Sequence, residues 1–194
     1  MQRLCFSAAI AAVLAASLPA AADDVTDQIN QALGAYQKQD LSTAVKSLDT
    51  AAGLIRQKKM EAWKAALPEA LPGWTADKAQ GTALAPALLG GATTVTRVYR
   101  KDGNTITISI IADSPMVATI AAFLSNSVVG LIGNTEIAVI NGRRALYGKD
   151  EKSFQTLAGD KVLVKVEGSS GIDDPVLREW FQAIDFAQLE KLAK

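Results

Sequence analysis

The stretch TTVTRVYRKDGNTITISIIADSP, residues 93–115, decides the fold of this chain. Two runs of alternating apolar and polar residues flank the dipeptide Asp102-Gly103, which is a strong signal for a tight hairpin turn. Ser114-Pro115 then supplies a helix N-cap and a proline at the first helical position. The stretch therefore predicts a β-hairpin that leads directly into a helix.

The register of this hairpin has two solutions. A two-residue loop pairs Arg97 with Ile108 and places Arg97 in the middle of an apolar face. A three-residue loop over Asp102-Gly103-Asn104 pairs Val98 with Ile108 instead and turns Arg97 to the other face. Because a slip of one residue moves every side chain to the opposite face, the environment of Arg97 depends on which loop forms.

No charged residue occurs between Asp113 and Glu136. The uncharged run is long enough to consider a membrane span. Polar residues at 125–127 and the glycines Gly130 and Gly133 interrupt it, and it stands between two hairpins. We therefore expect a helix from residue 115 that lies on a sheet, with lipid contact as the alternative interpretation.

Two further hairpins are predicted downstream. Asn141-Gly142 is typical of a type I′ turn and joins two strands over residues 136–147. Gly159-Asp160 lies between two apolar runs over residues 154–166, where valines alternate with charged residues. Upstream, residues 74–80 predict a first strand and residues 81–91 an apolar loop without regular structure.

The C-terminus predicts two short helices. Asp174-Pro175 begins the first, with Asp174 as its N-cap. Asp185 and Gln188 have the spacing of a capping box for the second, over residues 186–192.

Residues 25–66 have helical spacing with a turn at Lys38-Gln39-Asp40. We expect Thr26 or Asp24 to cap the first helix and Asp40 to cap the second. The small and large apolar residues of this segment resemble those of one tetratricopeptide helical hairpin: Ala32, Tyr36, Leu41, Ala44, Leu48 and Ala51. The resemblance implies a single αα-hairpin, which either packs on the following domain or binds a partner.

The order of elements predicts an α+β fold: an N-terminal αα-hairpin followed by an antiparallel sheet with helices packed mainly on one face. The middle and last helices are expected on that face. The order resembles the sheet-plus-helices domains of the PsbP/Mog1 type. Proline and glycine in the stretch LPEALPGW, residues 67–74, place a boundary there. The expected parts are a signal peptide (1–22), a helical hairpin (23–67) and an α+β domain (68–194).

The composition excludes several kinds of chemistry. The chain has 20 basic and 20 acidic residues, so no basic footprint for nucleic acid is present. It has no histidine, and its one cysteine, Cys5, lies in the expected signal peptide, which ends in small residues before a cleavage site after Ala22. Triads with histidine, thiol nucleophiles and zinc sites are therefore excluded. We predict no metal and no cofactor; a hydrolase or lyase that uses only carboxylates is not excluded.

Binding chemistry remains, and its candidates lie on or beside strands: Arg97, Tyr99, Arg143, Arg144 and Trp74. A guanidinium on an apolar sheet can clamp a carboxylate or phosphate, with aromatic rings beside it. The alternative is that these arginines are surface groups or form internal salt bridges, with Asp113 or Glu136 as partners.

The sequence as a whole resembles exported bacterial proteins with the same plan, a resemblance that implies no particular activity. We therefore predict a periplasmic, non-enzymatic binding or accessory protein. Its partner is a small anionic ligand or an envelope protein, the latter bound through the helical hairpin. The alternative is an envelope-associated protein that contacts lipid through residues 81–91 or 115–133.

Overall fold

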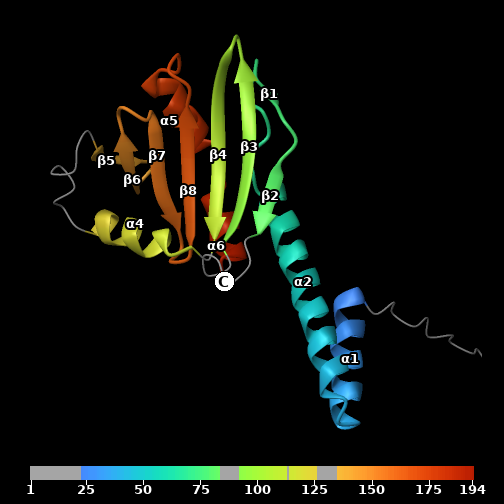
Figure 1. Ribbon diagram of the computed structural model, residues 1–194. Helices are drawn as coiled ribbons and strands as arrows, with labels where there is room; N and C mark the ends of the chain where they lie inside the picture. The colour runs from blue at the N-terminus through green and yellow to red at the C-terminus, as the bar shows by residue number, and fades with distance from the viewer. Residues whose placement is uncertain (1–22, 84–91, 113, 126–134) are drawn as a thin grey trace, which may run out of the picture. The chain divides into compact units, whose positions relative to one another are not determined.

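The computed structural model describes residues 23–83, 92–112, 114–125 and 135–194 (Figure 1). The expected signal peptide, most of the expected loop over 81–91, Asp113 and the second half of the uncharged run lie outside these residues. The chain divides into two compact units, residues 1–52 and 53–194, and the division falls within the second helix.

The first unit contains the expected helical hairpin, formed by α1 (Asp24–Gln37) and the beginning of α2 (Leu41–Ala65). The two helices pack together. Small side chains are buried in this unit, among them Ala32 and Ala44 at 3% and 5% exposure. Gln39 has a φ of 61°, the left-handed conformation that lets the chain reverse between the helices.

The caps of the two helices differ in how well the sequence predicted them. Asp23 caps α1 by accepting hydrogen bonds from the backbone N–H groups of Val25 and Thr26, so the expectation of Thr26 or Asp24 is wrong. Asp23 stands one residue earlier, where its carboxylate reaches the free N–H groups of the first turn. Asp40 caps α2 as expected, accepting from the Thr43 N–H at 3.1 Å.

The second unit is built on one antiparallel sheet of eight strands. Their order across the sheet is β1-β3-β4-β8-β7-β6-β5, with β2 also paired to β3. The strands are β1 (Thr75–Ala76), β2 (Gln80–Ala83), β3 (Thr93–Lys101), β4 (Asn104–Ala112), β5 (Thr135–Ile140), β6 (Arg143–Gly148), β7 (Ser153–Ala158) and β8 (Val162–Gly168). All three expected hairpins are confirmed, and Figure 1 shows β4 beside β8 in the centre of the sheet.

The single first strand expected over residues 74–80 is wrong. Two short strands, β1 and β2, pair with successive parts of β3, and β2 includes residues 81–83, so the expected loop without regular structure is wrong for those residues. Residues 77–79 stand opposite only two residues of β3. This extra residue makes a bulge. The bulge turns the Asp77 carbonyl and carboxylate toward two arginines of β3, Arg97 and Arg100.

Helices cover both faces of the sheet, most of them on one face. α5 (Asp174–Gln182), α6 (Phe186–Leu192) and the end of α2 share the larger core with residues such as Val164. α4 (Met116–Ser125) packs on the opposite face, against Leu146 and Leu163. The α+β class is thus confirmed, and the helix after Ser114-Pro115 does lie on the sheet, although not on the face of α5 as expected.

The C-terminal helices begin close to where the sequence placed them. Asp185 caps α6 by accepting from the Gln188 N–H at 2.9 Å, as expected. The expectation that Asp174 caps α5 is wrong: Asp173 occupies the N-cap position, and Asp174 is the first helical residue. The Asp174 carboxylate instead accepts a hydrogen bond from the Tyr147 hydroxyl on β6.

Candidate functional site

Arg97 lies on the core side of β3. Its partner across the β3–β4 hairpin is Ile108, so the two-residue loop forms, and Asp102 and Gly103 have the positive φ values of 49° and 78° that a type I′ turn requires. Side chains alternate along a strand, so Arg97 shares its face with Tyr99, which is buried. Arg97 therefore emerges at the edge of the larger core.

The guanidinium of Arg97 is fully engaged by nearby oxygens. It donates to both carboxylate oxygens of Glu69 at 3.3 Å, to the Pro68 carbonyl at 3.2 Å and to the Asp77 carbonyl at 3.1 Å. Its side chain is 16% exposed. The group thus ties residues 68–77 to the sheet. This is the internal salt bridge of the alternative interpretation, made with Glu69; Glu136 pairs with Lys149.

Tyr99 and Trp74 belong to an aromatic group centred on Trp180 of α5. The centroid of the Tyr99 ring lies 4.1 Å from that of Trp180, and Trp74 makes a T-shaped contact with Trp180 at 5.4 Å between centroids. The Tyr99 hydroxyl donates to the Pro68 carbonyl at 2.7 Å. Burial holds the pKa of Tyr99 well above its ordinary value, while the charge of Arg97 opposes this in part. These rings fill the core, and Trp74 alone is half-buried.

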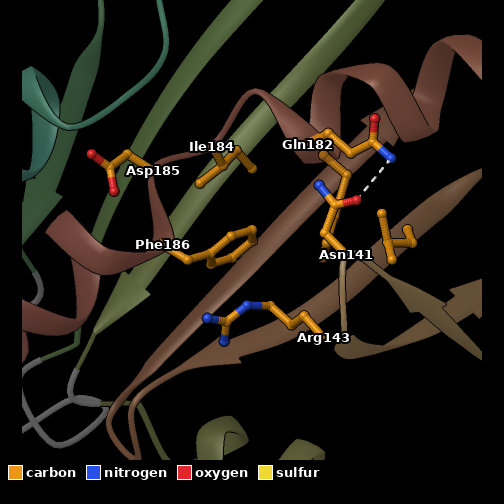
Figure 2. A pocket seen from close by; sticks show the side chains of 8 residues that line it. Asn141, Arg143, Gln182, Ile184, Asp185 and Phe186 are labelled. Carbon is orange, nitrogen blue, oxygen red and sulfur yellow. Dashed lines mark hydrogen bonds between the residues drawn. The ribbon is translucent and has the colours of Figure 1, made fainter.

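Arg143 lies on β6, at the other end of the sheet. Its guanidinium donates to Glu190 of α6 at 2.6 Å and to the Leu157 carbonyl at 2.8 Å, and it stacks over the Phe186 ring at 4.2 Å. A cavity of about 230 Å³ opens beside it, between the β5–β6 turn and the link from α5 to α6 (Figure 2). Because Glu190 neutralises Arg143, this cavity offers an anion little net attraction.

The same cavity has a small polar rim. Figure 2 shows Asn141 and Gln182 at one side, where the Gln182 amide donates to the Asn141 side-chain oxygen at 3.5 Å. Asp185 lies across the cavity, but its carboxylate caps α6. The polar groups of the rim are therefore largely used within the protein.

Arg144 faces the opposite side of the sheet from Arg143. It is exposed and borders an open hollow of about 480 Å³ with Leu124 and Thr156. Within the part of the chain that the structure describes, no carboxylate pairs with Arg144. It is a single charge on an open surface.

The five predicted residues do not meet in one site. Arg97, Tyr99 and Trp74 gather near β3, whereas Arg143 and Arg144 lie on β6, four strands away in the sheet. At the usual strand spacing, that separation is about 19 Å. Each of the two groups makes its own contacts, and within the residues that the structure describes no pocket is lined by both groups.

No cluster of three or more carboxylate, cysteine or histidine groups able to hold a metal occurs among the described residues. Tyr147 is buried, stacks on Phe154 at 4.7 Å and donates to Asp174. Burial, followed by that hydrogen bond, raises the pKa of Tyr147 to about 12.

The feature that sequence reasoning missed is the apolar face of the hairpin. Of nine large apolar side chains that the described residues expose, seven lie on α1 and α2. Six of them, within the first unit, are exposed by 45–65% and are named here the hairpin face: Ile29, Leu33, Tyr36, Leu41, Val45 and Leu48. The sequence grouped small and large apolar residues on one side of each helix; the structure separates them.

Helical geometry places all six residues on one side of the hairpin. Leu33 and Val45 each follow a buried alanine, Ala32 or Ala44, and so lie about 100° further round their helices. In both helices this offset is measured from the alanine that faces the other helix. Because the two helices run antiparallel, the same offset places the exposed residues of α1 and those of α2 on the same side of the hairpin. Their spacings of three and four residues are the signal that could have revealed this face.

No described helix is long and apolar enough to cross a membrane. Comparison with protein-family models, with curated proteins and with solved structures finds no significant match for this chain.

Proposed function

We propose that this protein is an exported, non-enzymatic binding or accessory protein that recognises another protein through the hairpin face. The observation that carries the proposal is the concentration of exposed large apolar side chains on α1 and α2. An exposed apolar patch of this kind marks an interaction surface, because leaving it in water is unfavourable. The expected signal peptide and the absence of cysteine after Cys5 support export to the periplasm.

The shape of the face favours a protein partner over a small ligand. It is a ridged surface of two helices, with side chains at the spacing by which helices pack against helices. Beside the candidate arginines, the cavity at Arg143 measures only about 230 Å³ and its charge is neutralised, and the hollow of about 480 Å³ at Arg144 is open. Binding energy is therefore available chiefly on the hairpin.

Site-specific photo-crosslinking in the producing cells tests this proposal. A photoreactive residue at Leu48 should give a protein adduct, whereas the same residue at Thr50, which faces the other side of α2, should give little. Both positions are exposed. Equal adduct yields at the two positions, or none at either, would contradict the hairpin face as a recognition surface.

Envelope association through residues 81–91 or 115–133 is a second hypothesis, favoured by the uncharged sequence between Asp113 and Glu136. Within that run, α4 buries Val117 and Ile120 on the sheet and exposes Met116. Under the first proposal, purified protein stays in solution when mixed with anionic vesicles. Partition onto vesicles that a Leu48→Glu change leaves intact would favour the second hypothesis.

A further inference from the structure

We propose that the partner of the hairpin face is a second copy of this chain, so that two hairpins pack face to face as a four-helix bundle. This inference rests on the proposed function and names the occupant of its surface. Its support comes from the shape of the face, its area, its charge and the composition of the seam between α1 and α2.

The hairpin has the form of half a four-helix bundle. Two antiparallel helices joined by a short turn present an apolar layer on one side. Thr50 and Gln31 stand on the other side and are exposed. Such a layer is covered completely by another two-helix layer with the same spacing, and the same hairpin supplies one.

The area of the face suits a stable symmetric contact. The six side chains together expose on the order of 600 Å², at the upper end of the roughly 300–600 Å² of the largest apolar patch on a typical monomer. Standard interfaces bury about 800 Å² on each partner. The hairpin face with its rim approaches that value.

The charge of the face allows self-association. None of its six members is charged, so a two-fold contact brings no like charges together at its centre. Asp49 stands at the edge of the face, where water remains, while Asp27 and Lys46 project from other sides of the helices. A partner selected by charge would need a charged face, which this one lacks.

The seam between the helices explains why a permanent partner is needed. Alanine dominates the buried apolar residues of the first unit: Val25, Ala32, Ala35, Ala44 and Ala51. Alanine buries little apolar area, so the seam alone holds α1 against α2 only weakly. A second copy is present wherever the protein is, and it buries the larger side chains that the seam leaves outside.

Sedimentation of charge variants at one position tests the inference. Wild-type protein should sediment at twice the subunit mass. Leu48→Glu and Leu48→Lys, each alone, should weaken the dimer by about a hundredfold or more, because a charge would be buried without a partner.

The matched controls are Thr50→Glu and Thr50→Lys, which introduce the same charges on the polar side of α2 and should leave the dimer intact. Glutamate and lysine are good helix formers, so none of these changes should unfold α2. Circular dichroism checks this. A dimer that withstands both Leu48 changes would overturn the inference.

The result also separates this inference from the proposed function. A wild-type monomer at about 100 µM, where a contact of this size should be occupied, would overturn the second copy as partner. If Leu48 still crosslinks to a different protein in cells, the hairpin face remains a recognition surface. A monomer with no adduct at Leu48 overturns both proposals.

Discussion

The hairpin and the sheet unit use apolar residues in opposite ways. In the sheet unit the largest side chains are inside: Trp180, Tyr99 and Phe154 are completely buried. In the hairpin the buried side chains are mostly alanines, and Tyr36 and Leu41 are 65% and 60% exposed. The two regions therefore differ in how much apolar surface remains for a partner.

This difference separates stability from recognition. Buried aromatic and aliphatic side chains supply most of the free energy that stabilises the sheet unit. Close contact of alanines brings α1 and α2 together and leaves their larger residues available. Truncation of a large buried side chain should therefore destabilise the sheet unit. Truncation of a large exposed side chain in the hairpin should instead weaken the association of the protein with its partner.

The largest effect is expected for Trp180→Ala. The change removes the ring that Tyr99 and Trp74 pack against and should lower the free energy of unfolding of the sheet unit by about 3–5 kcal/mol. Denaturant unfolding followed by near-ultraviolet circular dichroism measures it. Tyr36→Ala is the matched aromatic change in the hairpin and should leave that transition within about 0.5 kcal/mol. Equal losses would contradict the comparison.

A smaller loss is expected for Arg97→Ala, which removes the arginine donor of the Asp77 carbonyl and leaves the Pro68 carbonyl with the Tyr99 hydroxyl alone. We expect about 2 kcal/mol from the unfolding free energy of the sheet unit. Glu69→Gln should cost less than about 1 kcal/mol, because the Glu69 side chain is 89% exposed. If Arg97→Ala leaves the free energy of unfolding unchanged, the guanidinium does not stabilise the fold and is again a candidate for binding a ligand.

Alkaline pH should weaken the sheet unit. The pKa of Tyr147 is about 12 in the folded protein and near 10 when unfolded, so its contribution to stability is complete below pH 10 and is lost as the pH rises toward 12. Unfolding midpoints between pH 9 and 12 measure the decline. Tyr147→Phe should lower stability at pH 8 and flatten the decline; an unchanged slope would contradict this assignment.

The smallest effect concerns the hairpin itself. Because a dimer stabilises its folded form by mass action, the melting temperature of wild-type protein should rise by a few degrees with concentration. Leu48→Glu should remove this dependence, and Thr50→Glu should preserve it. Calorimetry over a hundredfold range of concentration makes the measurement. A dependence that survives Leu48→Glu would place the contact elsewhere.

Local signals predicted most of the fold. Asp102-Gly103 and Asn141-Gly142 adopt the positive φ values that their turns require, and these turns set the registers of two hairpins. Ser114-Pro115 likewise precedes α4. These features depend on a few neighbouring residues, so an isolated sequence is sufficient to find them.

The candidate site was less predictable. The oxygens of Glu69 that hold Arg97 come from 28 residues away in the sequence, and Glu190 reaches Arg143 from 47 residues away. Long-range pairs of this kind depend on how the sheet is ordered. The sequence indicated that guanidinium groups lie on strands; their partners inside the protein could not be read from it.

The sequence by itself determined the helices, the turns and the hairpins, because hydrogen bonds between near neighbours and the spacing of apolar residues specify them. Only the tertiary structure decided which apolar side of the hairpin stays exposed. Ala32 and Leu33 are adjacent in the sequence and equally compatible with a helix. The closeness of α1 and α2 selects the small side chains for the seam and leaves the large ones outside, and packing of that kind depends on volume in three dimensions.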